Sequence, residues 1–283
     1  MSSATKLYAV IGDPVEHSLS PVMQNVAFQS LDLNSIYLAF KVTSNNLENA
    51  IIGMKSLGIL GFNVTVPHKV SVMKYLDEVD PQAVEVGAVN TVVNKEGILK
   101  GYNTDGAGAL AALREAGVKI EGQKVVLLGA GGAAKALAYN VASLAESLII
   151  FNRTESKAKN LATSLTERLG FKVEGKEITD IVLCSSLRDA DILINATSVG
   201  MYPRINETPL QSQDFHSGMT VFDIVYNPLL TRLLREAKAA GAHSIGGVKM
   251  LVYQGALAFE LWTGRKPPIK KMCDAVEKVL KRE

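Results

Sequence analysis

The sequence has little cysteine, no long hydrophobic run and no excess of one charge. Its 283 residues include only two cysteines, Cys184 and Cys273, so neither a disulfide framework nor a CxxC metal pair can be written. No stretch approaches the ~18 continuous apolar residues of a membrane span, and 30 Lys and Arg residues nearly balance 28 Asp and Glu residues. We therefore expect a cytoplasmic protein that binds neither membrane nor nucleic acid, uses no metal and acts on a small molecule.

The length and the pattern of apolar residues predict a two-domain α/β protein. A chain of this length corresponds to two domains of ~150 residues, and short apolar runs alternate with helical patterns, as in parallel sheets with crossover helices. We expect strands at residues 6–12, 35–42, 59–66, 124–129, 147–152, 192–196 and 220–225. A hairpin with the four-residue loop 94–97 is expected to join residues 89–93 to residues 98–102.

The domain boundary is expected where the polar residues 103–106 lead into a helix at residues 107–116. Residues 1–106 would form the first domain and residues 107–249 the second. Two long helical patterns, at residues 250–262 and 269–282, follow the last expected strand. Residues 250–283 are therefore expected to return to the first domain as helices.

A glycine-rich loop lies between an expected strand and an expected helix of the second domain and has the pattern GxGxxA. Gly129 permits the tight turn, Gly131 lets the backbone approach a pyrophosphate, and Ala134 allows close packing of the helix. Methyltransferase loops and purely structural glycine turns share this pattern, but its position favours a dinucleotide. The expected cofactor-binding residues of the loop are Gly129, Ala130, Gly131, Gly132, Ala133 and Ala134.

The strand after this loop ends in Asn152-Arg153-Thr154, where an NAD-binding enzyme usually offers an acidic side chain to the ribose 2′-hydroxyl. An arginine stands there instead, and Lys157 follows one helical turn later. These residues suit a 2′-phosphate, which favours NADP over NAD. An alternative remains open, in which Thr154 caps the next helix while Arg153 and Lys157 lie on its solvated face.

Polar residues that periodicity does not require occur near the start of the first domain. Ser20-Pro21 is explained as a helix N-cap followed by proline at the first helical position. Ser18 has no such explanation. Two hydroxyls beside a helix N-terminus would bind a carboxylate well.

A second polar segment begins within the expected strand at residues 59–66 of the first domain. Asn63 and Thr65 face one side of that strand, and Lys69 falls in the first turn of an expected helix, where its charge opposes the helix dipole. A snorkelling surface lysine is the alternative, and His68 is expected to pack or cap.

Asp105 alone would be a helix N-cap. Together with Lys69, it supplies the carboxylate and ammonium needed beside a carbonyl that accepts a hydride.

These residues lie in motifs that resemble the shikimate dehydrogenase family nearly from end to end. The motifs are SLSP at residues 18–21, NVTVPHK at 63–69, GAVNT at 87–91, NTDG at 103–106, the loop at 129–134, NRT at 152–154, NATSVGM at 195–201, DIVYNP at 223–228 and GVKMLVYQ at 247–254. The resemblance implies an NADP-linked oxidoreductase acting on a CH–OH group, which reduces 3-dehydroshikimate to shikimate, a step toward the aromatic amino acids.

The same resemblance implies an α/β substrate domain, a Rossmann-like NADP-binding domain and a substrate held in the cleft between them. It makes Lys69 and Asp105 the catalytic pair. The substrate would be surrounded by Ser18, Ser20, Asn63, Thr65, Asn90, Tyr226 and Gln254. Besides the glycine-rich loop, the cofactor would contact Asn152, Arg153, Thr154, Lys157, Thr197, Ile224 and Gly247, with Ile224 and Gly247 on the nicotinamide side.

Two other functions remain open at this point. A quinate dehydrogenase of the same family would act on a saturated ring with one extra hydroxyl, and the Arg153-Thr154 pattern argues weakly against it. An idle NADP-binding regulatory module could lose Lys69 and Asp105, yet both are present. The protein is expected to be a monomer or a homodimer.

Overall fold

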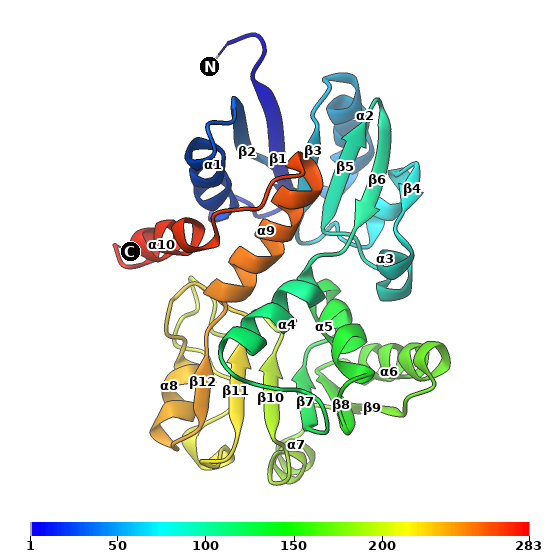
Figure 1. The fold of residues 1–283 in the computed structure, drawn as a ribbon. Coiled ribbons are helices and arrows are strands. Elements are labelled where there is room, and N and C mark those ends of the chain that lie inside the picture. The colour runs from blue at the N-terminus through cyan, green and yellow to red at the C-terminus, as the bar shows by residue number, and fades with distance from the viewer. Residues whose placement is uncertain (1, 283) are drawn as a thin grey trace. The chain divides into compact units, whose positions relative to one another are not determined.

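The computed structural model describes residues 2–282, and the chain divides into two compact units. Unit 1 comprises residues 1–108 and 252–279, and unit 2 comprises residues 109–251 and 280–283. Each unit has a sheet with helices packed against it (Figure 1). Two helices continue from one unit into the other, α4 (Asp105–Glu115) and α9 (Val248–Thr263). The expected α/β class is confirmed.

Unit 1 has a six-stranded sheet in the order β2-β1-β3-β5-β6-β4. Its strands are β1 (Lys6–Gly12), β2 (Ser35–Lys41), β3 (Gly61–Val64), β4 (Glu78–Val79), β5 (Thr91–Lys95) and β6 (Ile98–Tyr102). β1 runs parallel to β2 and β3, whereas β5 runs antiparallel to β3 and β6. Its helices, besides parts of α4 and α9, are α1 (Ser20–Ser30), α2 (Leu47–Ser56), α3 (Pro81–Val86) and α10 (Ile269–Leu280).

Both faces of this sheet are apolar because successive side chains of a strand point to opposite sides. Ala9 and Ile11 of β1 lie in a buried cluster with Leu47, Ile51 and Met54 of α2. On the other face, the ring of Tyr8 packs against Phe28 of α1 and Trp262 of α9. Helices therefore cover β1 on both sides, which explains its continuous apolar sequence.

Three local expectations for unit 1 are wrong. The hairpin loop has two residues, Glu96 and Gly97, both with positive φ, as a tight primed turn requires. No α-helix follows Lys69, which lies in a turn before the 3-10 helix η2 (Ser71–Tyr75), so no α-helix dipole opposes its charge. α1 begins at Ser20 itself, with Leu19 at the N-cap and no capping side chain.

Unit 2 has a fully parallel six-stranded sheet in the order β12-β11-β10-β7-β8-β9. Its strands are β7 (Lys124–Leu128), β8 (Ser147–Asn152), β9 (Val173–Glu177), β10 (Ile192–Asn195), β11 (Thr220–Asp223) and β12 (His243–Ile245). The helices between them are α5 (Gly132–Ala142), α6 (Glu155–Leu169), α7 (Asp180–Leu187) and α8 (Arg232–Ala239). The order reverses beside β7, and in such sheets ligands bind at the carboxyl ends of the strands where the order reverses.

The outer edge of the unit 1 sheet is covered at one point by a side chain. Asn25 of α1 donates from Nδ2 to the carbonyl oxygen of Tyr37 in the edge strand β2 at 2.9 Å. Its Oδ1 accepts from the Tyr37 N–H, also at 2.9 Å. The carboxamide therefore makes the two bonds that a neighbouring strand would make with that residue.

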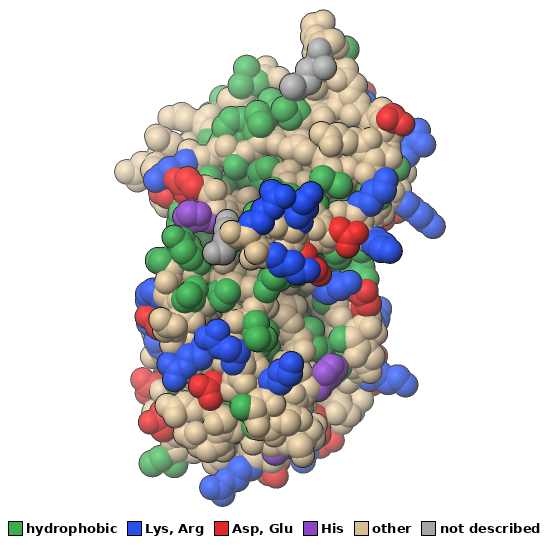
Figure 2. Space-filling view, turned by 90° about the vertical axis from the view of Figure 1, so that its left-hand side faces the viewer, with side chains coloured by type: hydrophobic (Ala, Val, Ile, Leu, Met, Phe, Trp, Pro, Cys, Tyr) green, Lys and Arg blue, Asp and Glu red, His purple; other side chains and the backbone are tan. Residues whose placement is uncertain are grey.

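The surface carries charges of both signs. Acidic side chains lie among basic ones on the face shown in Figure 2. None of the helices in the described part of the chain is long and apolar enough to cross a membrane.

Candidate active site

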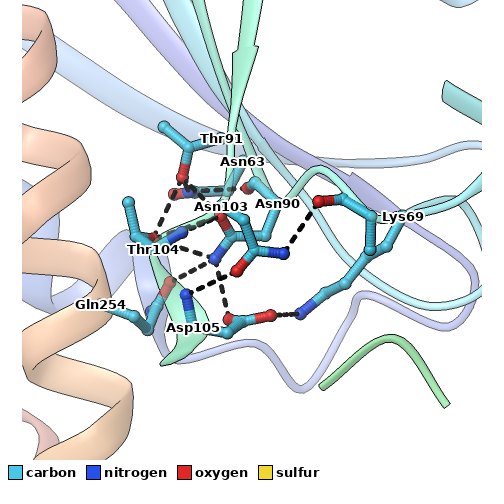
Figure 3. A network of polar contacts seen from close by, with 9 residues as sticks. Asn63, Lys69, Asn90, Thr91, Asn103, Thr104, Asp105 and Gln254 are labelled. Carbon is cyan, nitrogen blue, oxygen red and sulfur yellow. Dashed lines mark hydrogen bonds and ion pairs between the residues drawn. The ribbon is translucent and has the colours of Figure 1, made fainter. Parts of the chain in front are cut away.

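The structure brings together Lys69 and Asp105, which are 36 residues apart in the sequence (Figure 3). Lys69 Nζ lies 2.5 Å from Asp105 Oδ2, and the two side chains are 15% and 5% exposed. Asp105 is the first residue of α4, and Lys69 is held by its carbonyl oxygen, which accepts from the Val89 N–H at 2.7 Å. A lysine so nearly buried is not a snorkelling surface side chain.

Asn90 sets the orientation of the Asp105 carboxylate. Its Oδ1 accepts from the Thr104 backbone N–H at 2.8 Å, and a backbone donor cannot become an acceptor. The amide NH₂ must therefore face the other way, where Nδ2 donates to Asp105 Oδ1 at 2.8 Å. Each oxygen of Asp105 thus has its own donor, Asn90 for one and Lys69 for the other. This arrangement suits an ionised carboxylate, which can only accept.

Neutral polar groups surround this pair. Asn90 Nδ2 also approaches Thr104 Oγ1 at 2.9 Å and Gln254 Oε1 of α9 at 3.3 Å. Its two hydrogens therefore face three acceptors, and the contact with Gln254 is the longest of the three. Asn103 accepts from the Asp105 N–H through Oδ1 at 3.1 Å and donates to the Ala88 carbonyl oxygen at 2.9 Å.

The two serines of the SLSP motif lie at the start of α1. The Ser18 hydroxyl oxygen is 3.3 Å from the Ser20 N–H. The N-terminus of α1 has no capping side chain, and Pro21 in the first turn has no N–H to offer. Ser20 is buried and Ser18 is half-buried. The positive end of the helix dipole thus has two hydroxyl groups beside it.

Thr65 of the NVTVPHK motif is half-buried beside Gly12. A Cβ on Gly12 would lie 2.3 Å from Thr65 Cγ2, so only glycine leaves room for this side chain. His68 is fully buried, and its Nε2 lies 2.6 Å from the Val42 carbonyl oxygen. The expectation that His68 packs rather than reacts agrees with this placement. Tyr226, the remaining expected substrate residue, belongs to unit 2, where burial raises the pKa of its phenol.

The glycine-rich loop of unit 2 has the geometry that a dinucleotide phosphate needs. Gly129 adopts φ +111°, and a Cβ there would lie 2.9 Å from the Ala196 carbonyl oxygen. Gly131 is the N-cap of α5 and offers no side chain, and apart from residues 130–132 no heavy atom lies within 4 Å of the place where its Cβ would be. The N-terminal N–H groups of α5 are therefore open to an anion, and these residues fit a bound pyrophosphate.

Exposed cationic side chains follow the next strand, β8. Arg153 and Lys157 are exposed, whereas Glu155 forms an ion pair with Lys159 at 2.9 Å. Thr154 occupies the N-cap position of α6, but its hydroxyl makes no capping bond. Asn152 donates from Nδ2 to the Thr154 carbonyl oxygen at 3.0 Å, which holds this turn. Thr154 is therefore the N-cap of α6 by position but makes no capping hydrogen bond, and the exposed Arg153 and Lys157 agree both with a solvated helix face and with a phosphate site.

A buried network holds the loops after β10 and β11. Asp223 is fully buried and accepts from Asn195 Nδ2 at 2.9 Å, from the Val225 N–H at 3.1 Å and from Thr231 Oγ1 at 2.6 Å. Burial raises the pKa of Asp223 to about 6, and these three hydrogen bonds limit the rise. Asn195 in turn accepts from Thr197 Oγ1 at 2.7 Å.

The structure also brings together Ile224 and Gly247. A Cβ on Gly247 would lie 2.2 Å from the Ile224 carbonyl oxygen, so the two backbones touch. No group of three or more His, Cys, Asp or Glu side chains that could hold a metal ion occurs among residues 2–282.

Four residues of the network in unit 1 were not identified as site residues from the sequence. Thr91, Asn103 and Thr104 lie inside motifs, so their position beside Asn90 and Asp105 was the available signal. Tyr37 gave no signal, because an aromatic residue in a strand is explained by packing alone. Its hydroxyl nevertheless donates to Asn63 Oδ1 at 2.7 Å.

Comparison with known proteins gives consistent matches along the chain. Three family models match it, "Shikimate dehydrogenase substrate binding domain" at residues 10–92, "Shikimate / quinate 5-dehydrogenase" at residues 110–228 and "Shikimate 5'-dehydrogenase C-terminal domain" at residues 247–277. The shikimate dehydrogenase (NADP(+)) of Methanosarcina mazei is 50% identical over 279 residues, which cover 97% of this chain and 99% of that protein.

Solved structures of similar proteins have the same fold. A crystal structure of a shikimate dehydrogenase in complex with NADP+ matches with a TM-score of 0.93 and 45% identity, covering 99% of this chain and 97% of that one. The Thermus thermophilus shikimate 5-dehydrogenase in complex with NADP(H) and shikimate matches with a TM-score of 0.88 and 37% identity, covering 97% of this chain and 100% of that one.

Proposed function

Because the chain belongs to the shikimate dehydrogenase family, we propose that it catalyses the reversible, NADPH-dependent reduction of 3-dehydroshikimate to shikimate. The observation that carries this proposal is the nearly buried ion pair of Lys69 and Asp105, surrounded by neutral amides and hydroxyls. A polyhydroxylated ring needs such neutral donors and acceptors, and a carbonyl under reduction needs a proton donor beside it.

Lys69 is the proton donor of the proposed reaction. NADPH, when bound, supplies a hydride to the carbonyl carbon of the substrate. The Lys69 ammonium stabilises the negative charge that develops on the carbonyl oxygen and transfers a proton to it. Asp105 holds the ammonium in place through Oδ2, while Asn90 fixes Oδ1. In the reverse direction, the Lys69 amine accepts the hydroxyl proton.

Unit 1 supplies the other proposed contacts with the substrate except Tyr226, which belongs to unit 2. Ser18 and Ser20, beside the uncapped N-terminus of α1, suit the carboxylate. Asn90 and Gln254 suit the hydroxyls, because a substrate hydroxyl can replace the 3.3 Å contact between them. Thr65 and Tyr226 complete the proposed set.

We assign the cofactor to unit 2. The open N-terminus of α5 suits the pyrophosphate, and the exposed Arg153 and Lys157 suit the 2′-phosphate that distinguishes NADP from NAD. The close contact of Gly247 with Ile224 leaves a backbone surface without a side chain, against which a flat nicotinamide ring could lie. We place the reaction in the cytoplasm, a setting supported by Cys184 and Cys273, neither of which forms a disulfide.

An absorbance assay at the NADPH band tests the proposal. We expect oxidation of NADPH with 3-dehydroshikimate, far slower oxidation with 3-dehydroquinate and none without a substrate. Faster turnover of 3-dehydroquinate would make the protein a quinate dehydrogenase. Cofactor binding without turnover of either substrate would make it a regulatory module, and the proposal would be wrong.

A further inference from the structure

A tyrosine of β2 reaches across the sheet of unit 1 to the polar network. Tyr37 lies opposite Tyr8 of β1, and Asn63 of β3 lies opposite Val10 of β1. Tyr8 and Val10 are two residues apart, so all four side chains lie on one face of the sheet. The Tyr37 side chain therefore crosses β1, and its hydroxyl oxygen lies 2.7 Å from Asn63 Oδ1. Both Tyr37 and Asn63 are buried.

The direction of this hydrogen bond is fixed by the other contacts of Asn63. One amide hydrogen goes to the Asn90 carbonyl oxygen at 3.1 Å, and the other goes to Thr91 Oγ1 at 3.0 Å. Asn63 Oδ1 can only accept, so the Tyr37 hydroxyl must donate. Burial raises the pKa of this phenol, which keeps the hydroxyl protonated. Asn63 has no hydrogen left for a substrate, and its role is to hold residues 90 and 91.

The hydrogen bonds of the Asn63 amide are connected to the Lys69–Asp105 pair through residues 90 and 91. The Asn90 carbonyl oxygen, fixed by Asn63, belongs to the residue whose side chain donates to Asp105 Oδ1. Thr91 Oγ1, which accepts from Asn63, donates to Asn90 Oδ1 at 3.0 Å. The Asn63 amide is therefore bonded to the backbone of Asn90 and, through Thr91, to its side chain.

We propose that Tyr37 is a positioning residue for the Lys69–Asp105 pair, acting through Asn63 and Asn90. Without the Tyr37 hydroxyl, Asn63 Oδ1 is buried and has no donor, so only the Asn90 carbonyl oxygen and Thr91 Oγ1 still hold the amide in the orientation that residues 90 and 91 require. This inference rests on the proposed function, since its effect is read in the turnover of that reaction.

The test compares Tyr37→Phe with Tyr8→Phe. Tyr8 is a matched control, because it lies on the same face of the adjacent strand, packs against the same Trp262 ring and has no place in the polar network. Tyr37→Phe also removes a hydrogen bond between this hydroxyl and Ser20, so KM for shikimate is not the deciding readout. We expect Tyr37→Phe to lower kcat about tenfold and to shift the pH profile of kcat. Tyr8→Phe should behave as wild type. A Tyr37→Phe enzyme with normal kcat and an unshifted pH profile overturns the proposal.

A second pair of variants separates positioning from general destabilisation. If Tyr37 acts through Asn63, the double variant Tyr37→Phe/Asn63→Ala should have the same kcat as Asn63→Ala alone. If the two single substitutions each lower kcat and the double variant shows the product of both losses, the proposal is wrong. If Tyr37→Phe fails to fold, Asn63→Ala tests the proposal by itself. A normal kcat in Asn63→Ala would contradict an effect of Tyr37 that acts through Asn63. If wild type and Tyr8→Phe are both inactive with 3-dehydroshikimate, the proposed function fails, and this inference fails with it.

Discussion

Burial decides between the two explanations of Lys69. A lysine in a surface turn would be solvated and its ion pair would contribute little. Lys69 instead keeps only 15% of its side chain exposed, and its ammonium faces a carboxylate whose other oxygen is already bonded. Such a placement costs desolvation, which a protein tolerates where the charge is used for chemistry.

Replacing Lys69 tests its role in the reaction. We expect Lys69→Ala to lower kcat by roughly 10²–10⁴, the usual contribution of a positioned acid or base, with a much smaller change in KM. Lys74→Ala is the matched control, because Lys74 is an exposed lysine of the adjacent η2. Steady-state kinetics and titration with shikimate measure both variants. A near-normal kcat with a greatly raised KM would mean that Lys69 only binds the substrate.

Arg153 should set the choice of coenzyme. A charge-assisted bond to the 2′-phosphate contributes about 1.5–3 kcal/mol, so Arg153→Ala should weaken NADP roughly 10- to 150-fold and leave NAD nearly unchanged. Because Arg153 is exposed, the preference of the wild type for NADP should also shrink as salt rises. The measurement is kcat/KM for both coenzymes at low and high salt, with Lys159→Ala as the control. Equal losses for NADP and NAD would contradict the assignment.

At the scale of elements, apolar buried strands were predictable, whereas a polar edge strand and strands of two or three residues were not. β1, β7 and β8 have apolar residues on both faces, which identifies a covered strand from sequence alone. β9 reads Val-Glu-Gly-Lys-Glu, because it lies at the edge of its sheet and needs few apolar residues. β4 and β12 have two and three residues, too few for a period to be recognised.

A carboxylate introduced at the start of α5 should abolish cofactor binding without changing the stability of the fold. Gly131 has φ −82° and ψ −173°, which any residue can adopt, and open space where its Cβ would be. Gly131→Asp would therefore cap α5 and leave stability unchanged within a few tenths of a kcal/mol. Its charge would occupy the anion site, so we expect NADP binding to be lost.

Calorimetry with NADP and thermal unfolding of Gly131→Asp, beside Gly131→Ala, check this prediction. Gly131→Ala adds bulk without charge and should lose less affinity than Gly131→Asp. Tight NADP binding by Gly131→Asp would contradict the placement of the pyrophosphate at α5.

At the scale of the whole molecule, the network in unit 1 joins residues far apart in the sequence. Asn90 and Gln254 are separated by 164 positions. The resemblance identified Lys69, Asp105 and Asn90 because their motifs are intact, but it did not reveal what each atom contacts. Asn63 illustrates the limit, because its motif did not reveal the three partners that its carboxamide has in the network.

The stability of the protein should depend on pH through Asp223. Its pKa is raised from 3.8 to about 6, so folding favours the protonated carboxyl. The stabilisation is complete below the pKa of the unfolded chain and is lost as pH rises through about 6, for a total of about 3 kcal/mol. An asparagine cannot ionise. The free energy of unfolding of wild type relative to Asp223→Asn should therefore fall by about that amount between pH 4 and pH 7.

Urea unfolding at several pH values measures this dependence. Asp77→Asn is a control of opposite sign, because the Leu99 N–H and Lys55 lower the pKa of Asp77. Its carboxylate stabilises the fold above its unfolded pKa, and that stabilisation is lost as pH falls. A wild-type advantage over Asp223→Asn that does not change with pH would contradict the prediction.

The carboxamide of Asn25 has a consequence for the behaviour of concentrated protein. An edge strand with free backbone groups is a template on which another chain can add a strand, and such additions start aggregates. Asn25 occupies the outward N–H and carbonyl of Tyr37 in the middle of β2. An incoming strand would have to displace both bonds before it could pair along this edge. One side chain of α1 thereby hinders strand addition along the β2 edge of the sheet.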